Sequence, residues 1–148
     1  WILVSLASIP IVLFALLIVF SSDFMLDYKD FKIDLANSVN YANDNDSLRA
    51  EYQGTSTRVT VDNSQTIYET LTYGGTSFAD EKMPEGEAIL FDYGNGAIMK
   101  IWKRDAESVT VYYITPEEDE ILFSTVELCR FADFERLISQ EWGNSEWE

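Results

Sequence analysis

The chain contains no histidine and a single cysteine, Cys129, among its 148 residues. Histidine is the commonest general base, so the chain lacks the usual group for proton transfer. Ser–His and Cys–His nucleophile pairs and every imidazole metal site are also excluded, because each of them contains a histidine. One thiol cannot form an intramolecular disulfide, nor can it satisfy the spacing of a zinc or redox motif. We therefore expect Cys129 to be a small buried hydrophobic residue. We also predict that the chain has no catalytic residue, no cofactor-binding residue and no metal ligand, and that it is not an enzyme.

Basic side chains are scarce, with 10 Lys and Arg against 26 Asp and Glu, for a formal net charge of −16. This charge repels a polyphosphate, and no basic stripe is present, so nucleic acid is excluded as a partner. The acidity is typical of a solvated surface that keeps a domain soluble, and a basic partner is the alternative. A hydrolase that works through two carboxylates is also left open, since spacing cannot identify such a pair among 26 acids.

The first 20 residues contain no charged side chain, and most of them are Ile, Leu, Val, Phe or Ala. A helix of that length spans about 30 Å, which matches the hydrocarbon thickness of a bilayer. Pro10 lies inside this run, and membrane helices tolerate proline when nearby Ser hydroxyls satisfy the freed backbone groups. We predict a transmembrane anchor over residues 1–21, a single-pass membrane protein and a lipid bilayer as partner through residues 1–20.

Cleavage of this segment as a signal peptide is the alternative, since Val19 and Ser21 form a weak cleavage-like pair. Lys29 and Lys32 follow the apolar run closely and favour a cytoplasmic domain, but several Asp residues surround them. The position of the span at the N-terminal end instead resembles a signal anchor. On that ground we expect the domain, residues 22–142, to be extracytoplasmic, with residues 143–148 as a frayed tail.

The apolar pattern after the anchor predicts an α+β domain. Apolar residues recur at helical spacing from Phe24 to Ala42, which predicts that the anchor continues as an amphipathic helix to about residue 41. Residues 49–61 look extended. Asp62 with Gln65 resembles a capping box for a short helix over residues 63–73, and residues 76–86 have the composition of a long loop.

Between residues 87 and 125 the sequence shows four strand-like runs separated by turns, which predicts an antiparallel four-stranded meander. Alternation predicts the core-facing set, subject to a one-residue slip that would invert a strand. The set is Ile89, Phe91, Tyr93, Met99, Ile101, Val109, Val111, Tyr113, Ile121 and Phe123. Ser124 with Glu127 resembles the capping box of a last helix that packs through Leu128, Phe131, Glu135, Ile138 and Trp142.

The same alternation places Trp102 and Tyr112 on the opposite face of the meander. They form a possible partner surface, unless helices cover that face and bury them. Together with the absence of catalytic groups, this pair leads to the functional hypothesis of a membrane-anchored, non-enzymatic protein-interaction or sensing module. Another membrane or envelope protein is the expected partner.

The order of elements suggests an alternative function. An apolar N-terminal helix that continues as an amphipathic helix, followed by a connecting region and a four-stranded meander, resembles the layout of type IV pilins and pseudopilins. Those families carry a Gly-Phe processing junction and a Glu at the fifth mature position, where this chain shows Trp1 and Ser5. The resemblance implies a structural subunit of a filament, and layout alone does not carry function.

Overall fold

The computed structural model describes residues 28–73, 77–79, 82–125 and 128–145. A first helix, described over residues 28–45, precedes the other elements. These are β1 (Arg49–Tyr52), β2 (Thr55–Arg58), α2 (Val61–Tyr73), β3 (Ser77–Ala79), β4 (Ile89–Asp92), β5 (Ile98–Lys103), β6 (Val109–Ile114), β7 (Glu120–Thr125) and α3 (Phe131–Ser145). The predicted α+β class is confirmed.

The predicted anchor, residues 1–21, lies outside the described residues. In the part of the chain that the structure describes, no helix has the length and apolar character of a membrane span. Helix α3 reaches Ser145, inside the segment predicted as a frayed tail, and residues 146–148 are not described.

The strands form one antiparallel sheet of seven strands in the order β2-β1-β4-β5-β6-β7-β3. The predicted meander is confirmed as β4 to β7, but the strand count of four was wrong. Residues 49–61 contain a hairpin whose turn, Gln53-Gly54, takes positive φ angles of 51° and 74°. The predicted loop over residues 76–86 contains β3, which pairs with β7. The pairing of β3 joins residues about 46 positions apart, which local patterns do not reveal.

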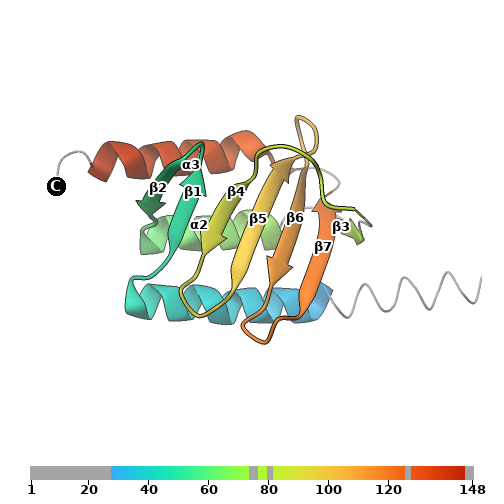
Figure 1. Ribbon diagram of the computed structural model, residues 1–148, viewed down its shortest axis with the longest axis horizontal. Coiled ribbons are helices and arrows are strands. Elements are labelled where there is room, and N and C mark those ends of the chain that lie inside the picture. The colour runs from blue at the N-terminus through green and yellow to red at the C-terminus, as the bar shows by residue number, and fades with distance from the viewer. Residues whose placement is uncertain (1–27, 74–76, 80–81, 126–127, 146–148) are drawn as a thin grey trace, which may run out of the picture.

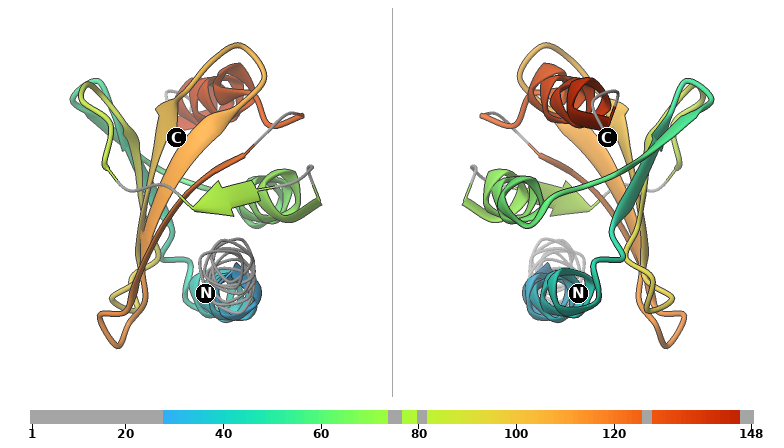
Figure 2. Two further views of the ribbon diagram at one scale, coloured as in Figure 1. Left: turned by 90° about the vertical axis from the view of Figure 1, so that its right-hand side faces the viewer. Right: turned by 90° about the vertical axis from the view of Figure 1, so that its left-hand side faces the viewer.

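All three described helices cover one face of the sheet, and none of them covers the other (Figures 1 and 2). The apolar stripe of the first helix is confirmed, because Phe31, Leu35, Val39 and Ala42 are buried against the sheet, while Phe24 is outside the described residues. The predicted core-facing set of the meander is also confirmed without a slip. Nine of its ten side chains are buried and Ile121 is partly buried.

Two predicted helix starts need correction. Helix α2 begins at Val61, and the hydroxyl of Thr60 accepts from the Asn63 amide at 3.4 Å, in place of the predicted cap at Asp62. The predicted cap of the last helix at Ser124 is also wrong, because Ser124 is a buried residue of β7. Helix α3 begins later, at Phe131. Leu128, predicted as a core contact, is 69% exposed with a φ of 63°. The buried core contacts of α3 are Phe131, Phe134 and Ile138, and Leu137 and the predicted Trp142 pack against the core while partly buried.

Candidate functional site

The helix-free face of the sheet carries an apolar surface that we call the open face. Cross-strand pairing places Leu90 opposite Lys100, Lys100 opposite Tyr112 and Tyr112 opposite Leu122, in one row across four strands. Ile98 and Ile114 are paired in the adjacent row. All six side chains are half-buried. A solvated face of an antiparallel sheet normally alternates to polar residues, so an apolar row at these positions is unusual.

Both residues of the predicted partner surface belong to this side of the sheet. Trp102 is only 6% exposed, because the segment that enters β4 crosses this end of the sheet (Figure 1) and the indole donates to the Gly86 carbonyl at 3.4 Å. Tyr112 is half-buried and belongs to the open face itself. A loop, rather than the helices considered from the sequence, therefore covers Trp102, and Tyr112 is the more accessible of the two.

The phenol of Tyr112 is held as a hydrogen-bond donor. It donates to Glu120 Oε1 at 2.8 Å. Partial burial and then the neighbouring Glu120 carboxylate raise the pKa of Tyr112, because both disfavour the phenolate. Tyr112 thus contributes a neutral aromatic ring to the row, with its hydroxyl held by Glu120.

Lys100 is the one cation within the row of the open face, between Leu90 and Tyr112. The ion pairs among the described residues involve only Arg58, Arg130 and Arg136 as cations, so the Lys100 ammonium has no carboxylate partner there. Its methylene stem can cover apolar surface while the ammonium reaches solvent. This geometry presents one positive charge at the centre of an apolar surface.

A second feature is an acidic pocket of about 350 Å³ between the first helix and the β6–β7 turn. Sequence analysis did not connect these acids, which come from segments about 80 residues apart. Five carboxylates line it, together with Phe31, Tyr113, Thr115 and Ile121; the acids are Asp30, Asp34, Glu117, Asp119 and Glu120. Among the residues that the structure describes, no group of three His, Cys, Asp or Glu side chains is placed to hold a metal ion.

At the base of this pocket, a buried hydrogen-bonded chain joins three elements. The hydroxyl of the fully buried Tyr113 donates to Asp34 Oδ1 and lies 3.0 Å from Ser38 Oγ. Ser38 Oγ in turn accepts from Asn95 Nδ2 at 3.0 Å. Burial, and then the hydrogen bond to Asp34, raise the pKa of Tyr113 well above its ordinary value. Because the phenol keeps its proton and bonds both Asp34 and Ser38, this hydrogen-bonded chain fastens the first helix to the sheet.

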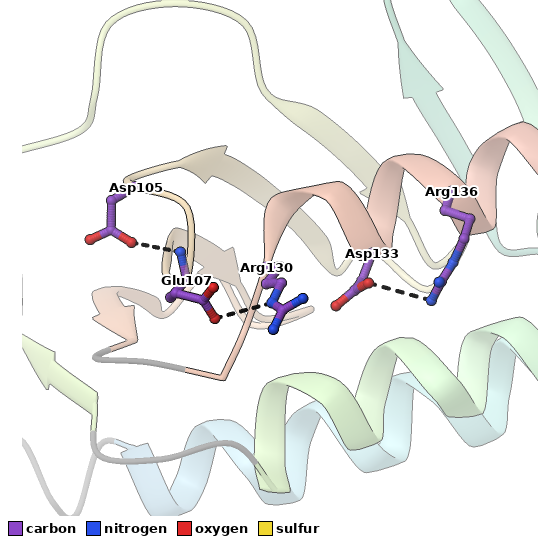
Figure 3. Close-up of polar contacts among 5 residues, drawn as sticks. All are labelled: Asp105, Glu107, Arg130, Asp133 and Arg136. Atoms are coloured by element: carbon purple, nitrogen blue, oxygen red, sulfur yellow. Dashed lines mark hydrogen bonds and ion pairs between the residues drawn. The ribbon is translucent and has the colours of Figure 1, made fainter.

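A third group of charged side chains lies where the β5–β6 turn meets α3 (Figure 3). Asp105 Oδ1 accepts from the Glu107 amide at 2.8 Å, and the Glu107 carboxylate pairs with Arg130 at 3.0 Å. Asp133 pairs with Arg136 at 3.4 Å within α3. The Glu107 carbonyl also accepts from the Cys129 amide at 3.1 Å. These contacts close the turn onto the start of α3.

Comparison with protein-family models, with curated proteins and with solved structures found no match to this chain. The open face and the acidic pocket are therefore interpreted from their own chemistry.

Proposed function

We propose that this chain is a membrane-anchored, non-enzymatic interaction module that binds another membrane or envelope protein through the open face. The observation that carries the proposal is the apolar row across β4 to β7, which none of the described helices covers. Contiguous apolar surface on a soluble face is typical of protein–protein contact sites. The apolar run of residues 1–20 supports the anchor.

The charge of the open face defines the chemistry of the partner. Lys100 lies between Leu90 and Tyr112 in the row, so a partner that buries this row must supply a carboxylate for the ammonium. The same partner must present apolar side chains on either side of that carboxylate. We infer a protein with an acidic residue inside an apolar patch.

A second copy of the chain fits this description less well. Two copies would bring together charges of −16 each, and long-range repulsion opposes their association at low salt. The filament alternative has to overcome this repulsion, whereas a partner of lower charge does not.

The test extracts the full chain from its native membrane in mild detergent and measures the mass and composition of what accompanies it.

A photo-crosslinker in place of Tyr112 is compared with one in place of Thr66, which is exposed on α2 on the helical side. We expect a defined partner to crosslink from position 112 and not from position 66. We also expect Lys100→Glu to abolish the crosslink, and the matched Lys82→Glu variant, at another exposed lysine, to retain it.

Two results would overturn the proposal. A monomer that crosslinks to nothing from position 112 removes the interaction surface. A polymer of the chain alone, formed equally by the Lys100→Glu variant, replaces the interaction module with the filament subunit. The melting temperature of each variant, measured in parallel, separates loss of binding from loss of folding.

A further inference from the structure

A groove of about 390 Å³ lies between the first helix and α2, on the helical side of the molecule away from the open face. It is lined by Lys29, Lys32, Ile33, Ala36, Asn37 and Tyr68. Ile33 is 53% exposed, and Tyr68 of α2 is half-buried beside it. The groove therefore combines two ammonium groups with exposed apolar surface.

The charge of the groove is opposite to that of the molecule. Lys29 and Lys32 are the only basic side chains between residues 28 and 48 in a chain of net charge −16. Within the described residues neither lysine has an ion-pair partner, and the Lys32 ammonium lies 5.1 Å from the centroid of the Tyr28 ring. Asp30 and Asp34 point to the acidic pocket on another side of the same helix. The first helix thus has separate basic and acidic sides.

The position of the groove in the chain brings it close to the membrane. The apolar run ends at Phe20, and Lys29 follows nine residues later. Basic side chains within about 15–20 residues of a span lie at the level where lipid headgroups act on them. An exposed Ile and a Tyr beside two lysines are typical of surfaces that rest at the boundary between headgroups and acyl chains.

We propose that this groove binds the headgroups of anionic phospholipids in the bilayer that holds residues 1–20. Lys29 and Lys32 pair with the lipid phosphates, and Ile33 and Tyr68 contact the adjoining apolar layer. The open face lies on the opposite side of the sheet from the groove, so lipid contact at the groove leaves the open face accessible to the partner. The inference rests on the anchor in the proposed function and adds a lipid contact of the domain at the membrane.

The experiment uses the full chain in nanodiscs made either of phosphatidylcholine alone or of phosphatidylcholine with phosphatidylglycerol. Lysines are acetylated for a fixed time, and modification at each position is measured by mass spectrometry. In the anionic nanodiscs we expect labelling at Lys29 and Lys32 to fall about fivefold, which corresponds to about 1 kcal/mol per lysine at an anionic surface. Labelling of the exposed Lys82 and Lys103 serves as the internal control and stays unchanged.

A second measurement uses charge variants. Anionic lipid should raise the melting temperature of the unmodified chain and of the control Lys82→Gln/Lys103→Gln. The same lipid should not raise that of Lys29→Gln/Lys32→Gln, and 0.5 M NaCl should remove the difference.

The outcomes separate this inference from the anchor. A chain that enters nanodiscs but shows equal labelling of Lys29 and Lys32 in both lipids overturns the groove and leaves the anchor intact. A chain that does not enter nanodiscs overturns the anchor and, with it, the lipid groove. Protection that is the same in neutral lipid shows apolar contact without phosphate recognition and also overturns the inference.

Discussion

Glu141 is a buried carboxylate that supports the N-terminal cap of a helix other than its own. It belongs to α3, is 4% exposed, and its Oε1 accepts from the Thr60 amide at 2.9 Å, from the Thr60 hydroxyl at 2.7 Å and from Asn63 Nδ2. These donors lie at the start of α2, where the backbone amides have no partner within the helix and a negative charge is favourable. A single side chain thereby joins α2 to α3.

We expect Glu141→Ala to lower the free energy of unfolding by about 3 kcal/mol, because several donors lose a charged acceptor inside the protein. Glu141→Gln keeps an acceptor oxygen without the charge and should cost less. Urea unfolding measures both changes, and Gln140→Ala, at the exposed neighbouring position, is the control with little expected effect. Equal stability of the Glu141→Ala and Gln140→Ala variants would show that the cap contributes nothing.

The thiol of Cys129 links stability to pH. Burial raises the pKa of Cys129 from 9.0 to about 11, so the folded chain keeps the thiol proton over a range where the unfolded chain releases it. A raised pKa in the folded state contributes stability that is complete below about pH 9 and is lost as pH rises toward 11.

We therefore expect the difference in unfolding free energy between the unmodified chain and Cys129→Ala to shrink by about 2 kcal/mol between pH 8 and pH 10.5. The pKa values of Tyr93 and Tyr113 are raised as well, mainly by burial, but both proteins carry them, so their contribution cancels in the difference. Chemical denaturation at several pH values measures the effect. A difference that is constant with pH would mean that the thiol titrates alike in both states.

At the scale of elements, the turn between β4 and β5 depends on Gly94. Its φ is +83°, and a Cβ atom added there would lie 2.7 Å from Ser47 Cβ and 2.8 Å from Ser47 Oγ. The Ser47 hydroxyl donates to the Tyr93 carbonyl at 2.7 Å and so connects the end of the first helix to this turn. A side chain at position 94 therefore both strains the backbone and disturbs that contact.

Gly54, in the β1–β2 turn, is the matched control, with a φ of +74° and no atom within 4 Å of an added Cβ. We expect Gly54→Ala to cost about 1–2 kcal/mol from backbone strain alone. Gly94→Ala should cost at least about 1 kcal/mol more, because overpacking adds to the same strain. Equal losses in urea unfolding would show that Ser47 moves aside without cost.

The elements that the sequence predicted well are those whose signal is local. The strands of the meander and the stripe of the first helix follow periodicity alone, and both were placed correctly. The hairpin of β1 and β2 was missed because its turn, Gln53-Gly54, lacks the Asn-Gly pair that marked the turn before β5. The cap of α2 was assigned to Asp62 rather than Thr60, because Glu141, which holds Thr60 in place, lies some 80 residues away.

For the open face, too, the sequence predicted only what depends on local alternation. Alternation assigned Trp102 and Tyr112 to the second face of the meander, and the register confirms that placement. The burial of Trp102 beside Gly86, and the position of Lys100 within an apolar row, depend on how a loop crosses the sheet and how four strands align. Neither follows from a periodic pattern in one segment.

For the molecule as a whole, the dominant electrostatic quantity is the net charge of −16. Self-repulsion of like charges opposes the compact state, and salt screens it within a Debye length of about 10 Å at 0.1 M. We expect the melting temperature of the full chain, measured in neutral detergent, to rise by about 5 °C between 0.01 and 0.5 M NaCl. Sucrose at the same osmolarity serves as the uncharged control. A melting temperature that falls as NaCl is added would mean that favourable ion pairs outweigh the repulsion between like charges.

The strand order also predicts which contacts form early in folding. Strands β4 to β7 are joined by short turns, so their pairing closes small loops, whereas β1 pairs with β4 about 40 residues away and β3 pairs with β7 about 46 residues away. Helix α2 carries the chain from β2 at one edge of the sheet to β3 at the other. We therefore expect the meander to form as an early local nucleus, and the β3–β7 pair, which needs α2 to cross the sheet, to form later.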